Sequence, residues 1–225
     1  RTLCTTASHQ AELLNWGLRD LVVWSRGVDT DRFQPCRDRS LHARPRLLFV
    51  GRVSVEKNIE AFLELQIDAD KVIVGDGPAR VELEKRFPEV SWLGFRKGEA
   101  LVREYARADV FVFPSRTDTF GLVMLEANAC GTPVAAYPVT GPKDVVKQGT
   151  NGALNTDLDT AVRQALLVSR TACRSYALAN GWDRIAERFV AALVPVNEDV
   201  ASGGHQLDNG AAWQQNNPPR SMTGY

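Results

Sequence analysis

Two carboxylates spaced eight positions apart, Asp118 and Glu126, are the first candidates for chemistry in this chain. Asp118 lies in a polar loop just before a predicted helix that begins at Gly121, and Glu126 lies inside that helix. The neighbours of Glu126 are apolar, so we expect a partly buried carboxylate that needs partners such as sugar hydroxyls. The first amides of the helix have no intrahelical partners and favour an anion in front of them. This stretch therefore predicts a site for a sugar and an anionic group.

Two cations come from a second stretch of the chain. Gly51, Arg52 and Lys57 follow the apolar run Leu47–Val50, which reads as a buried parallel strand. Open α/β sheets bind ligands at the carboxyl ends of their strands. Fixed positive charges there suit a diphosphate leaving group, whose developing charge must be neutralised as its bond to a sugar breaks. The alternative is a basic loop that faces solvent.

Several other polar motifs have two interpretations. Residues Gly75–Pro78 read either as a glycine loop that cradles phosphate or as a tight strand-to-helix turn, and Gly141–Asp144 reads mainly as a loop and helix start. Arg96 is either a base-stacking residue or a surface arginine. The acid pairs Asp29/Asp31 and Asp68/Asp70 have D-x-D spacing, but neither directly follows a strand that could aim it at a metal. We therefore expect no metal site.

The elements that must position these residues alternate regularly. From Pro45 onward, apolar runs and helical patterns follow one another, which predicts a Rossmann-like, doubly wound parallel sheet. One of the helices is expected from Val55 to Leu65. The stretch from Leu158 to Val194 reads as helical, with a break at Asn180-Gly181. Residues 195–225 contain few large apolar residues, so we expect a disordered tail.

Composition narrows the functional classes. The 225 residues carry a formal net charge of +0, which argues against a general nucleic-acid binder. The four cysteines are scattered singly, which indicates reduced thiols in a cytosolic setting. No apolar run approaches the roughly 20 residues of a membrane helix. The chain starts at Arg1 without a signal-peptide pattern or an initiator Met, so we expect a fragment.

The motif Asp118-x7-Glu126, with Phe120-Gly121 after the first acid, resembles the E-x7-E motif of retaining, nucleotide-sugar-dependent glycosyltransferases of the GT-B fold, family 4 type. The resemblance covers Pro45–Leu193 well and the preceding residues loosely. One departure is the Asp at position 118 in place of Glu, which keeps the carboxylate but shortens its reach by one methylene.

The resemblance implies a role for each residue. Arg52 and Lys57 would hold the donor's phosphates, Asp118 would face the hydroxyls of the transferred sugar, and Glu126 would hold the ribose hydroxyls. Arg52, Lys57, Asp118 and Glu126 are thus the catalytic candidates, and we expect them around one pocket at the carboxyl edge of the sheet. The implied donor-binding set is Gly51, Arg52, Lys57, Arg96, Asp118, Phe120, Gly121, Leu122, Val123 and Glu126.

The resemblance also implies a domain organisation, the C-terminal half of a GT-B fold with the N-terminal domain largely absent. Residues 1–24 would be a remnant of that domain, 25–44 the interdomain linker and 45–194 the nucleotide-sugar-binding domain. The absent domain would supply the acceptor pocket and any peripheral contact with the inner face of the membrane.

The implied activity is retaining hexosyl transfer from a nucleoside-diphosphate sugar to a glycan, lipid or small-molecule acceptor, without metal or cofactor. The alternatives are a catalytically inactive nucleotide-sugar-binding module and a sugar-nucleotide epimerase of the same fold.

Overall fold

The computed structural model describes residues 1–36, 43–117 and 120–193. Asp118 and the predicted tail, residues 195–225, lie outside the described residues. Arg1–Ala192 form one compact unit, and Leu193–Tyr225 form a second unit of which only Leu193 is described. Within the described ranges, no helix has the length and apolar character needed to cross a bilayer. Cys4, Cys36, Cys130 and Cys173 are free thiols in this structure.

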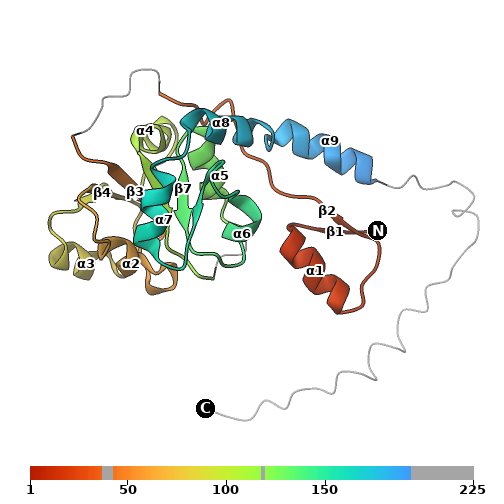
Figure 1. The fold of residues 1–225 in the computed structure, drawn as a ribbon, viewed down its shortest axis with the longest axis horizontal. Helices are drawn as coiled ribbons and strands as arrows, with labels where there is room; N and C mark the ends of the chain where they lie inside the picture. The colour runs from red at the N-terminus through yellow and green to blue at the C-terminus, as the bar shows by residue number, and fades with distance from the viewer. Residues whose placement is uncertain (37–42, 118–119, 194–225) are drawn as a thin grey trace, which may run out of the picture. The chain divides into compact units, whose positions relative to one another are not determined.

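A six-stranded parallel sheet organises the compact unit (Figure 1). Its strand order is β5-β4-β3-β6-β7-β8. The strands, in chain order, are β3 (Arg46–Val50), β4 (Asp70–Val74), β5 (Ser91–Trp92), β6 (Val110–Phe113), β7 (Val134–Ala136) and β8 (Gly152–Leu154). All five pairings between neighbours are parallel, so every loop that follows a strand emerges at the same edge of the sheet.

Helices cover both faces of this sheet, which explains why its strands are apolar without alternation. On β3, Leu48 packs into one core cluster with residues of α4 (Glu99–Arg107), α5 (Leu122–Ala129) and α8 (Arg170–Leu178). Its neighbours Leu47 and Phe49 point to the other cluster, with α2 (Ile59–Leu63), α3 (Arg80–Arg86) and α7 (Leu158–Ala165). The predicted doubly wound sheet is therefore confirmed.

Three local predictions need correction. The single helix expected from Val55 to Leu65 is a 3-10 turn, Val55–Lys57, followed by α2, because Asn58 adopts the left-handed conformation with φ 52° and interrupts it. The sequence also failed to reveal β8, whose three residues are too short for a strand pattern. The C-terminal helical stretch breaks at Asn180-Gly181 as predicted, before α9 (Trp182–Ala192), but it also breaks between α7 and α8.

The first residues form a separate two-stranded parallel sheet, β1 (Thr2–Cys4) with β2 (Leu21–Val23), joined by α1 (Ala7–Asn15). Its assignment to an N-terminal domain remains a prediction. The chain then returns to the larger sheet, where Val28 forms a parallel bridge with Gly181. Arg174 on α8 donates to the carbonyl oxygens of Thr30 (3.0 Å), Phe33 (2.7 Å) and Ala129 (2.9 Å). One guanidinium thus fastens the predicted linker to the end of α5.

A fully buried pair of amides joins α5 to the strands that follow it. Asn151 Nδ2 donates to Asn128 Oδ1 at 2.7 Å, and Asn128 Nδ2 donates to the carbonyl oxygens of Thr132 (3.0 Å) and Asn151 (2.9 Å). Both side chains are fully inaccessible to solvent. Buried polar groups that satisfy one another in this way fix a unique arrangement of the elements that carry them.

We expect Asn128→Ala to lower the free energy of unfolding by about 2–4 kcal/mol, because it strands buried donors and acceptors. Urea unfolding should show a lower midpoint at an unchanged slope. The control is Asn15→Ala, at an exposed helix end, which should stay within about 0.5 kcal/mol of the wild type. Equal midpoints for the two variants would contradict the importance of this amide pair.

Candidate functional site

The site is located by the point at which the order of the strands reverses. β3 pairs with β4 on one side and with β6 on the other, although β4 and β5 separate β3 from β6 in the sequence. The loops after β3 and β6 therefore leave side by side, and a crevice between such loops is where open α/β sheets bind ligands. Asn58 Nδ2 donates to the carbonyl oxygen of Pro114 at 3.0 Å and ties the two loops together.

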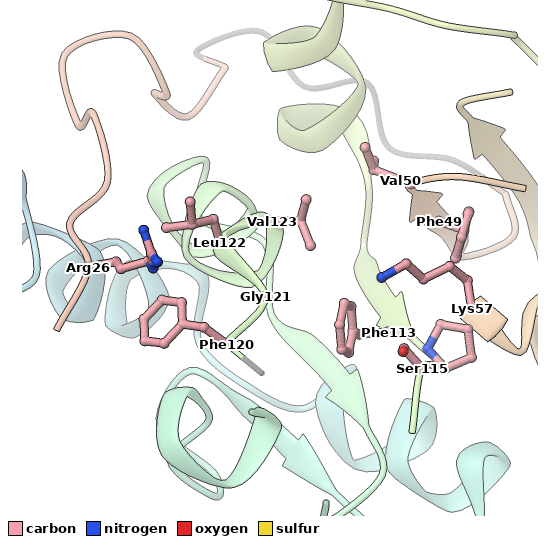
Figure 2. A pocket seen from close by; sticks show the side chains of 12 residues that line it. Arg26, Phe49, Val50, Lys57, Phe113, Ser115, Phe120, Gly121, Leu122 and Val123 are labelled. Atoms are coloured by element: carbon pink, nitrogen blue, oxygen red, sulfur yellow. The ribbon is translucent and has the colours of Figure 1, made fainter. Parts of the chain in front are cut away.

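The first cavity at this edge, which we call the Lys57 hollow, has a volume of about 350 Å³. It is lined by Arg26, Phe49, Val50, Gly51, Lys57, Phe113, Pro114, Ser115, Phe120, Gly121, Leu122 and Val123. Arg26 and Lys57 approach it from opposite sides, with the start of α5 between them (Figure 2). The hollow therefore combines two cations with the amino end of a helix, which favours an anionic ligand.

A second cavity, which we call the Glu126 hollow, has a volume of about 470 Å³. It is lined by Val50, Gly51, Arg52, Val74, Gly75, Asp76, Phe95, Arg96, Leu101, Val123 and Glu126. Val50, Gly51 and Val123 line both cavities, so the two hollows adjoin. An elongated ligand with an anionic centre can pass from one into the other over Gly51.

The predicted site residues are thus divided between two adjoining hollows rather than gathered around one. Lys57 and the start of α5 lie on the first, Arg52, Arg96 and Glu126 lie on the second, and Gly51 and Val123 belong to both. The structure does not describe Asp118, so its role stays a prediction.

In the Glu126 hollow, the carboxylate of Glu126 is held by a hydrogen bond from the core. The Tyr105 hydroxyl donates to Glu126 Oε2 at 2.9 Å. Tyr105 is fully buried and packs edge-on against Phe33 and Phe111, with ring centroids 6.0 and 5.6 Å away, so it holds this hydrogen bond in a fixed direction. Burial raises the pKa of Glu126 above its usual range, and the Tyr105 hydrogen bond and the Arg32 charge partly oppose that rise. The result is an oriented carboxylate with capacity to accept further hydrogen bonds.

Two glycines after β4, Gly75 and Gly77, allow two loops to pack in direct backbone contact. A Cβ on Gly75, whose φ is +143°, would lie 1.8 Å from the carbonyl oxygen of Gly51, and one on Gly77 would lie 2.3 Å from that of Val53. This loop therefore packs directly on the Gly51–Val53 segment that carries Arg52. Close backbone contact explains both glycines as a tight turn, as one of the two sequence interpretations proposed.

Several of the other acidic candidates form ion pairs or hydrogen bonds with residues of the protein itself. Arg44 forms ion pairs with Asp68 (3.1 Å) and with Asp70. Asp29 accepts a hydrogen bond from the Arg32 amide at 2.9 Å within a turn. At the start of α6 (Pro142–Val145), Asp144 accepts hydrogen bonds from both the amide (3.1 Å) and the hydroxyl (2.9 Å) of Ser8.

Sequence reasoning missed three residues of the site. Arg26 lay in a predicted linker, and Ser115 appeared to be ordinary loop polarity. Tyr105 lay on a helix whose spacing to Glu126 has no local pattern. Only the tertiary packing of α4 on α5 brings Tyr105 to Glu126. Ser115 carried one weak signal, its position two residues after the end of β6, which is Phe113.

The solved structure of sucrose-phosphate synthase from Thermosynechococcus elongatus superimposes with a TM-score of 0.74 and 26% sequence identity. The match covers 84% of this chain and 56% of that one. The fold is therefore that of the GT-B glycosyltransferases.

Residues 44–168 match the family model described as "Glycosyl transferases group 1", and the chain belongs to that family. It is 33% identical over 207 residues to a GDP-mannose-dependent alpha-mannosyltransferase of Corynebacterium glutamicum, covering 86% of this chain and 50% of that protein. It is 35% identical over 208 residues to the protein of the same name from Mycolicibacterium smegmatis, covering 84% and 56%. The chain spans about half the length of these relatives.

Replacing Tyr105 by Phe should raise the pKa of Glu126 further, because the hydrogen bond that favours the carboxylate form is lost. A carbon-detected NMR titration of the glutamate carboxyl groups measures this, with Glu126→Gln identifying the resonance. We expect the unfolding free energy to fall by about 1–3 kcal/mol. In the control Tyr176→Phe, the Glu126 titration should be unchanged. An unmoved Glu126 pKa in Tyr105→Phe would contradict the assigned role.

The raised pKa of Glu126 also makes the stability of the folded chain depend on pH. The native state binds this proton more tightly than the unfolded chain does. The contribution of this group to stability is therefore fully present below the unfolded pKa and is lost as the pH rises through the raised native pKa.

Proposed function

We propose that this chain is the donor-binding half of a glycosyltransferase that takes its sugar from a nucleoside-diphosphate sugar. The observation that carries the proposal is the pair of adjoining hollows, which share Gly51 as a wall at the switch point between β3 and β6. Together they match the parts of such a donor: a nucleoside, a diphosphate and a hexose in line.

The Glu126 hollow suits the nucleoside. Its carboxylate, oriented by Tyr105, can accept hydrogen bonds from two ribose hydroxyls. Phe95 is 70% exposed at the rim, beside Arg96, and the two offer flat surfaces to a base. Ionised Glu126 is costly in its half-buried position, so hydroxyl donors from a ligand would stabilise it.

The diphosphate would lie over the shared wall, between Arg52 on one side and Lys57 with the start of α5 on the other. These charges and amides would stabilise the negative charge that develops on the leaving phosphate. They supply the positive potential that the leaving group requires. For that reason we propose that the reaction needs neither a metal nor an organic cofactor. The hexose would occupy the Lys57 hollow, facing Asp118.

We propose GDP-mannose as the first donor to test, because the mannosyltransferases reported above are named for that donor. We propose retention of anomeric configuration because the Asp118–Glu126 spacing, with Phe120-Gly121, follows the motif of retaining enzymes. The acceptor would be a glycan, a lipid or a small molecule, bound partly by residues outside this chain.

A thermal-shift panel of GDP, UDP and ADP tests donor binding. At a concentration about 100-fold above Kd, the best diphosphate should stabilise the chain by about 2.7 kcal/mol, a rise in Tm of roughly 5–10 °C. Arg52→Ala should reduce that rise severely. Arg184→Ala, an exposed arginine on α9 paired with Glu187, should leave it intact. If no nucleoside diphosphate raises the Tm, the proposed function is wrong.

The affinity for that diphosphate should decrease as the pH falls through the pKa of Glu126, which burial places above its ordinary value. Protonated Glu126 accepts fewer hydrogen bonds from ribose, and well below the pKa the loss should approach about tenfold per pH unit. Calorimetric titration between pH 4.5 and 8 measures it. Glu126→Gln should bind more weakly and with a flat profile in this range. A wild-type profile that is equally flat would exclude Glu126 as the ribose ligand.

A further inference from the structure

Ser115 carries a buried hydroxyl that has no hydrogen-bond partner among the described residues. Ser115 is 1% exposed, and no group in the described part of the chain forms a hydrogen bond with its Oγ. A buried hydroxyl of this kind costs stability, because it has given up its hydrogen bonds to water. A ligand that enters the cavity it lines can supply the missing partner.

The structure shows which cavity this side chain borders. Ser115 lines the Lys57 hollow, and Figure 2 shows its oxygen beside the ring of Phe113, on the same side of the hollow as Lys57. The preceding residue is held in place, since Asn58 donates to the Pro114 carbonyl oxygen at 3.0 Å. The loop therefore presents the serine from a rigid support, as a binding residue requires.

The position of Ser115 determines which part of a donor its hydroxyl can reach. It lines the Lys57 hollow and is absent from the lining of the Glu126 hollow, where we place the nucleoside. Of the two phosphates that we place over the shared wall, the terminal one, which is attached to the sugar, would lie on the Lys57 side. The phosphate next to the nucleoside would lie on the Arg52 side.

We propose that the Ser115 hydroxyl donates a hydrogen bond to an oxygen of the terminal phosphate of the bound nucleoside diphosphate. This inference rests on the proposed function and adds a specific ligand contact to it. A hydroxyl donor next to a cation recognises the phosphate by direction as well as by charge, and its hydrogen bond strengthens as the leaving phosphate gains negative charge.

Calorimetry of Ser115→Ala with GDP and with GMP tests the contact. Affinity for GDP should fall about tenfold to a hundredfold, the usual effect of losing one hydrogen bond to a charged group. Affinity for GMP, which lacks the terminal phosphate, should stay within about twofold of the wild type. If UDP or ADP gives a larger thermal shift than GDP, the calorimetry uses that nucleotide and its monophosphate in place of GDP and GMP.

Thermal melting without ligand separates binding from folding. Ser115→Ala removes a buried hydroxyl that has no partner in the described ranges, so its Tm should equal or exceed that of the wild type. The matched control is Ser169→Ala, whose hydroxyl accepts a hydrogen bond from the Ala172 amide at the start of α8 and lines neither hollow. That variant should melt at a lower temperature and bind GDP normally.

Two results would overturn the inference while leaving the donor site in place. One is wild-type affinity for GDP in Ser115→Ala, in a titration where Arg52→Ala abolishes binding. The other is an equal loss for GDP and GMP, which would place the serine on another part of the ligand. If the wild-type chain binds none of the three diphosphates, the proposed function fails and this contact fails with it.

Discussion

The parallel pairing of β3 with β6 is the constraint on which the rest of the site depends. It joins two strands that are far apart in the sequence and sends their following loops out of the same edge of the sheet. One loop carries the cations, and the other leads into the amino end of α5, the helix that carries the half-buried Glu126. Without that pairing, the two loops would not lie side by side and could not form a crevice together.

The surrounding packing keeps this edge rigid. Gly75 allows the loop after β4 to lie directly against Gly51, and Asn58 joins the loop after β3 to that after β6. Behind α5, Tyr105 orients Glu126 from within the core. The polar groups of the site are therefore held by elements that are themselves fully packed, which is the arrangement that preorganised binding requires.

Most of the fold could be predicted from sequence, because buried parallel strands are apolar without interruption and the helices between them have their own periodicity. Gly51, Lys57 and the start of α5 could be predicted as site residues because each follows a recognisable strand. Arg26, Ser115 and Tyr105 could not, since their proximity to the site depends on contacts between distant segments. The division into two adjoining hollows likewise depends on how side chains fill the edge, which no local pattern encodes.

The Arg174 anchor has a mechanical consequence. Its hydrogen bonds to Thr30 and Phe33, together with the bridge at Val28, make that segment part of the body that carries the sheet. On the other side of Arg26, the Trp24 indole donates to the carbonyl oxygen of Ile185 at 3.1 Å. Arg26 is therefore carried on a short segment that is attached to the body at both ends, and it reaches the Lys57 hollow from a fixed backbone.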